Sequence, residues 1–207
     1  PDAEAQFSAS IAHSEPDDIR MLIYTSGTTG APKGAMLSHH NILNNGFFCG
    51  EVLRYTEVDR VCVPVPFYHC FGMVIGNLAC TSHGACIVVP GEGFDPRGTL
   101  AAIEAERCTS LYGVPTMFIA QLDHPDFDRT DFSSLRTGVM AGSPCPVEVM
   151  KQVRQRMHIP EITICYGMTE TSPVSTQTRV DDPVTMRVTR VGRIHPHARR
   201  AQRNLRH

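Results

Sequence analysis

The sequence contains little lysine and has no apolar run long enough to cross a bilayer. Lysine occurs only at Lys33 and Lys151, although Lys and Arg together number 19 in the 207 residues. The apolar content is ordinary for a globular domain, and no transmembrane segment is predicted. The first ten residues, PDAEAQFSAS, lack the basic start and apolar centre of a signal peptide, and they lack an initiator methionine. We therefore expect a sequence that begins inside a longer protein.

Closely spaced cysteine pairs are also missing. The 8 cysteines include no C-x-x-C pair, and most stand among apolar residues. This pattern favours reduced, buried thiols over a disulfide framework or a zinc site. A reducing compartment, the cytosol or an organelle matrix, is expected. The cysteines are Cys49, Cys62, Cys70, Cys80, Cys86, Cys108, Cys145 and Cys165.

The charge is balanced overall but uneven along the chain. A formal net charge of -2 gives no general attraction to nucleic acid. Arginines crowd the end, where HARRAQRNLRH shows no apolar periodicity. We expect one partial domain over 1–193 and a basic tail over 194–207 that is disordered or out of frame. Nucleic-acid binding by that tail is a less favoured alternative. The composition leaves the oligomeric state open.

Apolar patterns predict an α/β fold with a mostly parallel sheet flanked by helices. Short apolar runs indicate buried strands, and segments with helical spacing alternate with them. Ser38 is a predicted cap for the first long helix. Strands are predicted within 19–25, 60–66, 85–90, 109–115, 135–143 and 161–167, and helices within 39–53, 72–82, 97–107, 115–123 and 146–157.

Polar or glycine-rich loops follow three of these strands, which end near Thr25, Val139 and Cys165. In open α/β sheets, ligands bind beyond the carboxyl ends of the strands. The three loops are therefore expected to meet at one crevice.

The loop YTSGTTGAPKG (24–34) has the chemistry of a polyphosphate site. Its glycines permit positive φ angles and a close approach of the backbone, and exposed amides in such a turn bind anions. Lys33 follows Pro32 and precedes Gly34, so no hydroxyl stands beside the lysine as a Walker loop requires. The predicted phosphate-binding residues are Thr25, Ser26, Gly27, Thr28, Thr29, Gly30 and Lys33.

A second polar segment is YGMTETSP (166–173). Tyr166 at a strand end can stack on a base, and Gly167 follows it. Thr169 offers a hydroxyl to a phosphate, and Glu170 offers the oxygen ligand that Mg²⁺ prefers. Alone this segment is weak evidence, but together with 24–34 it predicts a magnesium nucleotide site.

At this point the sequence resembles the adenylate-forming superfamily of acyl-CoA synthetases, luciferases and the adenylation domains of peptide synthetases. The loop 24–34 is similar to the family's signature, PFYHCFG (66–72) to its aromatic-histidine motif, and AGSP (141–144) to its adenine and acyl pocket. Order and spacing agree over 19–193. YHCFG, LYGVPTMF and AGSPCP most resemble medium-chain fatty-acyl-CoA synthetases.

The resemblance implies a carboxylate that attacks ATP to give an acyl-adenylate and pyrophosphate, after which coenzyme A displaces AMP. Lys33 and the loop hydroxyls would hold the β- and γ-phosphates, and Glu170 would bind Mg²⁺. Thr169 would contact the α-phosphate, with Tyr166 stacking on adenine. Gly142 and Ser143 would form the opposite wall, and His69 would lie beside the reacting carboxylate. An ordinary half-buried histidine is an equal alternative for His69.

The resemblance also implies missing parts. The family's long N-terminal portion, its later ribose-binding aspartate, its hinge and its C-terminal domain have no counterpart in these residues. We therefore expect a partial AMP-binding N-terminal domain that is poorly active alone. Activation of aryl or amino acids and a non-catalytic nucleotide-binding fragment are the alternatives. A P-loop NTPase is disfavoured by the context of the lysine.

Overall fold

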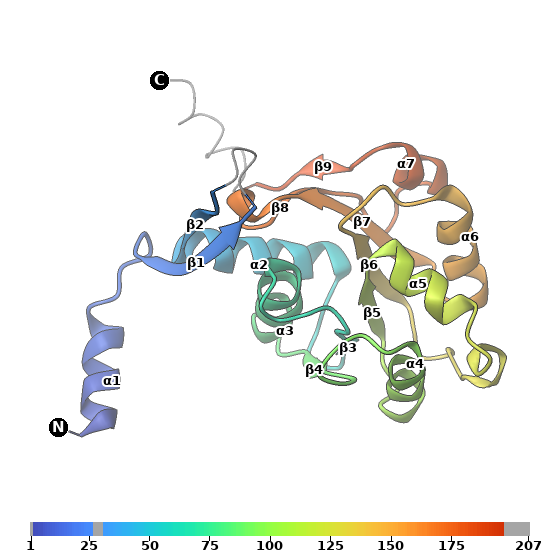
Figure 1. Ribbon diagram of the computed structural model, residues 1–207, viewed down its shortest axis with the longest axis horizontal. Helices are drawn as coiled ribbons and strands as arrows, with labels where there is room; N and C mark the ends of the chain where they lie inside the picture. Colours follow the sequence, from blue (N-terminus) through green and yellow to red (C-terminus); the bar gives the residue numbers. More distant parts are fainter. Residues whose placement is uncertain (1, 27–30, 197–207) are drawn as a thin grey trace.

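A seven-stranded sheet forms the centre of the molecule (Figure 1). The computed structural model describes residues 2–26 and 31–196. The strand order is β4-β3-β5-β6-β7-β8-β9. The first five strands in this order are parallel to one another. β8 is antiparallel to both of its neighbours, β7 and β9. The strands are β3 (Arg60–Cys62), β4 (Cys86–Val88), β5 (Ser110–Gly113), β6 (Thr137–Ala141), β7 (Glu161–Gly167), β8 (Val174–Gln177) and β9 (Arg193–Ile194).

Helices cover both faces of this sheet, so the predicted α/β architecture is confirmed (Figure 1). One face packs against α4 (Pro96–Ala105), α5 (Pro115–Leu122) and α6 (Val147–Arg156). The other face packs against α2 (His39–Leu53), the π-helix η1 (Phe71–Leu78) and α3 (Ala79–Thr81). The remaining helical segments are α1 (Ala3–Ala12), η2 (Phe127–Arg129), η3 (Thr169–Thr171) and α7 (Val184–Thr189).

The parallel strands are apolar on both faces because both faces are covered. Leu111 and Met140 belong to the core under α4, α5 and α6. Their neighbours Tyr112 and Val139 belong to the core under α2, η1 and α3. Alternating side chains along one strand therefore enter two different cores, which explains the near-continuous apolar runs in the sequence.

The first predicted strand, 19–25, is a strand but is not buried in the parallel sheet. β1 (Ile19–Thr25) pairs antiparallel with β2 (Lys33–Ser38) in a separate hairpin. Met21 and Ile23 pack towards α2 and η1, whereas Leu22 is 60% and Tyr24 75% exposed. An apolar run does not show which strand will pair with it, and here the nearest partner along the chain is antiparallel.

The other sequence predictions agree with the structure in most places. Ser38 caps α2 by accepting a hydrogen bond from the Asn41 amide, as expected. β4 forms as predicted, but at the sheet edge, where Cys86 is exposed. Ile194 pairs with Thr176 at the edge of the sheet but is exposed, whereas His195 is 3% exposed and is buried. The remainder of the predicted tail, from 197, lies outside the described residues.

The structure also bears on membranes and thiols. Within the described ranges, no helix combines the length and apolarity needed to span a bilayer. All eight cysteines are free thiols, and six of them are buried. The predicted burial of most cysteines is therefore confirmed.

Candidate active site

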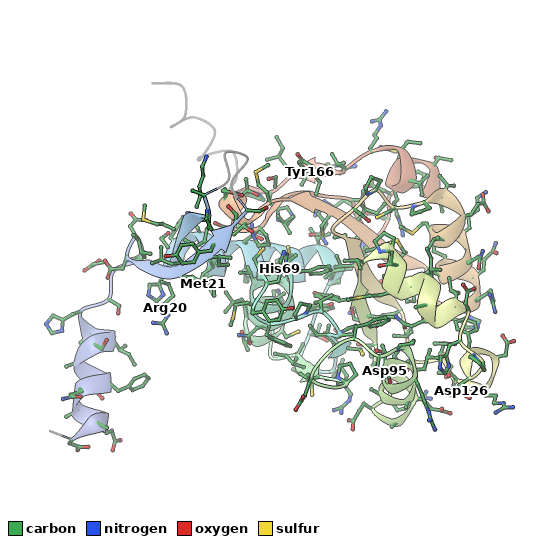
Figure 2. All side chains as sticks on the ribbon, in the orientation of Figure 1. Arg20, Met21, His69, Asp95, Asp126 and Tyr166 are labelled. Atoms are coloured by element: carbon green, nitrogen blue, oxygen red, sulfur yellow. The ribbon has the colours of Figure 1, made fainter. Side chains whose placement is uncertain are left out.

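A cavity of about 290 Å³ lies at the carboxyl ends of β6 and β7, the edge where the sequence predicted a ligand crevice. It is bounded by segments that follow β3, β6 and β7. Figure 2 shows two of its residues, His69 and, nearer the upper edge of the view, Tyr166, in the part of the molecule between the β1–β2 hairpin and α5. The predicted site residues around this cavity are His69, Gly142, Tyr166, Gly167, Thr169 and Glu170.

The ends of the phosphate loop lie against the turn that carries Glu170. The Thr25 hydroxyl lies 3.3 Å from Glu170 Oε1, to which it donates, and 3.4 Å from the Lys33 carbonyl oxygen. Thr25 and Lys33 are register partners at the end of the hairpin where the connecting loop begins and ends. Residues 145 positions apart therefore meet at one place. Ser26 is exposed, and Gly27, Thr28, Thr29 and Gly30 lie outside the described residues.

Thr169 and His69 both line this cavity, and Cys70, the neighbour of His69 in sequence, links them. Cys70 Sγ is 3.8 Å from Thr169 Oγ1, which ties the start of η1 to the η3 turn. Burial raises the pKa of the Cys70 thiol, so the sulfur is a neutral partner. The Phe71 amide donates to His69 Nδ1 at 3.0 Å. That bond leaves the proton of a neutral His69 ring on Nε2, a donor at the cavity edge.

A second cavity, of about 450 Å³, adjoins the first and shares Gly142 and Tyr166 with it. Ser143 also lines this space, so the three residues predicted to enclose adenine are brought together. Gly142 has φ +92°, and a Cβ there would lie 2.9 Å from Val114 Cγ1. The turn after β6 therefore needs glycine at 142, which leaves an open backbone face opposite the half-exposed Tyr166 ring.

The inner part of the first cavity is apolar. Phe71, Ile75 and Val174 line it, while Thr169 and Glu170 line its polar part. Such a space suits a molecule with a charged head and an apolar chain.

Sequence reasoning missed three residues that shape this site. Tyr112 stacks on Phe71 with ring centroids 5.8 Å apart, and its hydroxyl donates to the Ile75 carbonyl at 3.3 Å. Cys70 contacts Thr169 as described above. Asn45 is wholly buried and hydrogen-bonded to the start of β8. A detectable signal existed only for Asn45, a polar residue on the apolar face of the predicted helix.

The donor set around Glu170 fits magnesium. It consists of one carboxylate and a neighbouring hydroxyl, both hard oxygen donors. Among the described residues there is no group of three or more His, Cys, Asp and Glu side chains that could hold a metal. Mg²⁺ is commonly held by one or two carboxylates while waters and substrate phosphates complete its shell, so a single carboxylate here is sufficient.

Comparison with known proteins identifies the family. The family model described as AMP-binding enzyme matches residues 2–202. The chain therefore belongs to the AMP-binding enzyme family, in agreement with the resemblance found in its motifs.

Several relatives are closely similar over most of this chain. YngI from Bacillus subtilis is 57% identical over 181 residues, which cover 87% of this chain and 33% of YngI. Acyl-CoA ligase SID4 from Ajellomyces capsulatus is 48% identical over 88% of this chain and 31% of its own length. The mitochondrial medium-chain acyl-CoA ligase ACSF2 from Danio rerio is 48% identical over 87% of this chain and 30% of its own length. The chain thus spans about a third of the length of these relatives.

Solved structures show the same fold. The ATP-bound structure of MatB from Rhodopseudomonas palustris superposes with a TM-score of 0.76 at 30% identity, over 88% of this chain and 35% of MatB. The anthranilate CoA ligase AuaEII, in complex with anthranoyl-AMP, gives a TM-score of 0.79 at 28% identity, with the same two coverages.

Proposed function

We propose that the full-length protein carrying this chain is an ATP-dependent, AMP-forming acid–CoA ligase. The observation that carries the proposal is the contact of Thr25, the register partner of Lys33, with Glu170 beside a cavity that has one polar and one apolar part. Family membership and the names of the relatives, among them SID4 and ACSF2, support it. In this reaction the acid's carboxylate oxygen bonds to the α-phosphorus of ATP and pyrophosphate leaves. The thiol of coenzyme A then displaces AMP, giving the thioester.

Phosphoryl transfer needs positioning and charge neutralisation more than covalent catalysis. The segment 25–33, with its hydroxyls, glycine amides and Lys33, would hold the β- and γ-phosphates. Glu170 would hold Mg²⁺, which offsets negative charge on the phosphates when it is bound. The Thr25 hydroxyl fixes one oxygen of Glu170, so the carboxylate is already oriented towards the loop.

Thr169 and His69 would act at the reacting end of the acid. Thr169 Oγ1 would donate to an α-phosphate oxygen, where negative charge increases as the new bond forms. His69 would present its Nε2 proton to the acid's carboxylate and keep the carboxylate oriented. Tyr166 would stack on adenine, with Gly142 and Ser143 as the opposite wall of the second cavity.

The apolar part of the first cavity favours a fatty acid, and the similarity to ACSF2 favours medium chain length. ATP and Mg²⁺ would be bound by this chain, with coenzyme A as co-substrate. Six buried free thiols are consistent with a reducing compartment such as the cytosol or an organelle matrix.

The test is pyrophosphate release by the full-length protein with ATP, Mg²⁺ and a panel of acids. We expect octanoate and its neighbours in length to give turnover, and an aromatic or amino acid to give little. A preference for amino or aryl acids would replace the fatty-acid assignment, and no turnover with any acid would overturn the ligase assignment.

The Glu170→Gln variant tests the metal role within the same assay. Removal of the charge should lower kcat/KM for ATP about 100-fold, because a preorganised electrostatic contact to the phosphates is lost. Glu148→Gln is the matched control, since Glu148 is exposed on α6 and forms an ion pair with Lys151 on the same helix. Equal activity of the two variants would contradict the assignment of Glu170.

A further inference from the structure

The buried amide of Asn45 joins α2 to the strand that follows the Glu170 turn. Asn45 is 0% exposed and lies near the middle of α2. Its Nδ2 donates to the Val174 carbonyl at 2.9 Å, and its Oδ1 accepts from the Val174 amide at 3.1 Å. Nδ2 also lies 3.4 Å from the Thr171 carbonyl. One donated and one accepted hydrogen bond to the backbone of the same residue fix both the position and the direction of the chain at that point.

The segment 168–173, which precedes Val174, is held together by hydrogen bonds among its own residues. The Thr171 hydroxyl contacts the Pro173 carbonyl at 2.6 Å and the Met168 carbonyl at 2.9 Å. The Met168 amide donates to the Pro173 carbonyl at 3.0 Å. These bonds make 168–173 one compact turn, which carries Thr169 and Glu170. Because Asn45 is bound where this turn joins β8, displacement of that junction displaces Glu170 with it.

The other end of α2 leads directly to the phosphate loop. Ser38 is the last residue of β2 and the cap of α2, so strand and helix follow without a linker. Lys33 at the start of β2 and Asn45 therefore lie on one continuous, ordered segment. Asn45 thus connects the segment that begins at Lys33 to the strand that follows the Glu170 turn.

Packing alone does not account for an amide at this position. A buried polar group costs free energy unless its hydrogen bonds are made, and an apolar side chain would fill the space without that cost. Its neighbour Asn44 shows the contrast, because it donates to the His40 carbonyl of its own helix at 2.7 Å. The two bonds between Asn45 and Val174 thus join α2 to β8.

We propose that Asn45 is a positioning residue that holds Glu170 at the correct distance from Thr25 and Lys33. The proposal rests on the proposed function, because it assigns Asn45 to the Mg²⁺ and ATP site of the ligase. Asn45 acts through the turn 168–173 and touches neither substrate nor metal.

The test measures binding of ATP to the full-length protein by calorimetry across a range of Mg²⁺ concentrations. Asn45→Ala should raise the Mg²⁺ concentration needed for half-maximal ATP binding about 10-fold, as is typical when a partner that orients a metal ligand is lost. ATP binding without Mg²⁺ should be unchanged. In a Glu170→Gln background, Asn45→Ala should have no further effect on the Mg²⁺ dependence, because the positioned ligand is already absent.

Two controls separate positioning from general destabilisation. Asn44→Ala removes an amide of the same kind one residue away and should leave the Mg²⁺ dependence unchanged. Leu53→Ala, at the far end of α2, removes a wholly buried side chain and should lower the melting temperature without a shift in Mg²⁺ dependence. Hydrogen exchange provides a readout independent of nucleotide, since amides of 168–176 should exchange faster in Asn45→Ala only.

If Asn45→Ala fails to fold, Asn45→Asp keeps the shape but loses the donor to Val174, and the same Mg²⁺ shift is expected. An unchanged Mg²⁺ dependence in a folded variant would overturn the inference, whether or not hydrogen exchange accelerates. Unsubstituted protein that binds no ATP with Mg²⁺ would overturn the proposed function, and the inference with it. These two results are distinguishable because the first retains binding and the second lacks it.

Discussion

The carboxylates of Asp59 and Glu170 lie at opposite ends of the parallel strands, and their surroundings also differ. Glu170 is exposed at the carboxyl edge, where a ligand can reach it. Asp59 precedes β3 at the amino edge and is 2% exposed. Arg136 donates to both oxygens of Asp59, at 3.1 and 2.7 Å, and the Thr109 hydroxyl donates at 2.7 Å. The Glu170 carboxylate is therefore available to a ligand, whereas the hydrogen bonds of the Asp59 carboxylate are made within the protein.

The Asp59 cluster makes stability depend on pH. Burial alone would raise the pKa of Asp59, but the hydrogen bonds from Arg136, Thr109 and Thr56 outweigh it and lower the pKa below its usual value. A lowered pKa means that the carboxylate adds stability above the unfolded value of about 3.9, and that this contribution is lost as pH falls through the folded pKa.

Asp59→Asn should therefore lower the free energy of unfolding by about 2 kcal/mol at pH 7. This cost is smaller than that of breaking a fully buried ion pair, because Arg136 is 33% exposed. Denaturant unfolding across pH measures this. The difference between variant and unsubstituted protein should shrink progressively as pH falls below about 4, the unfolded pKa, and it should disappear only once the folded Asp59 is itself protonated. A difference that is constant down to pH 2 would contradict the ionic origin of the effect.

At the scale of elements, α2 and the helix 71–81 approach each other closely. A Cβ at Gly46 of α2 would lie 2.6 Å from Leu78 Cβ and 3.1 Å from the Ala79 amide nitrogen. Cβ atoms do not approach so closely in real proteins, so the two helices need glycine at 46 to keep this distance. The contact matters for the site because η1 carries Phe71 and Ile75 of the cavity.

Gly46→Ala is expected to destabilise the protein by about 1 to 2 kcal/mol. Helix propensity alone would favour alanine by about 1 kcal/mol, but overpacking against a backbone outweighs this gain. Thermal or denaturant unfolding measures the change. Gly93→Ala is the control, since a Cβ there meets no atom within 4 Å, and its stability should change by less than about 0.5 kcal/mol. A stabilised Gly46→Ala variant would show that the helices move apart freely.

At the scale of the whole molecule, the site is only one part of what its relatives contain. The chain spans 30% to 33% of the length of YngI, SID4 and ACSF2. Leu22, Tyr24 and Met36 expose 60%, 75% and 65% of their surface on the outer face of the β1–β2 hairpin, next to the phosphate loop. The hairpin is therefore covered on the side of α2 and η1 only, and its outer face is left without packing in the part of the chain that the structure describes.

The 207-residue chain by itself should therefore release pyrophosphate at least roughly 100-fold more slowly than a full-length relative given ATP, Mg²⁺ and octanoate. The same phosphate assay measures both proteins. ATP binding by the chain in the presence of Mg²⁺, without turnover, would agree with the prediction. Turnover near that of the relative would contradict it and show that this segment holds the complete catalytic machinery.

The sequence by itself determined the elements, the fold class and the loops that carry the site. Apolar periodicity and caps are local, so the helix after Ser38 and the strands before Gly142 and Gly167 could be predicted. The motifs 24–34 and 166–173 also indicated their chemistry, because hydroxyls, glycines, a lysine and a carboxylate suit phosphate and magnesium whatever the packing.

Only the tertiary structure decided which residues meet. It placed 19–25 in a separate antiparallel hairpin, because strand pairing depends on partners that a single apolar run does not specify. It also put Thr25 within 3.3 Å of Glu170 and gave the buried Asn45 a partner in Val174. Contacts across more than a hundred positions arise from how helices and strands pack together, and no local pattern in the chain encodes them.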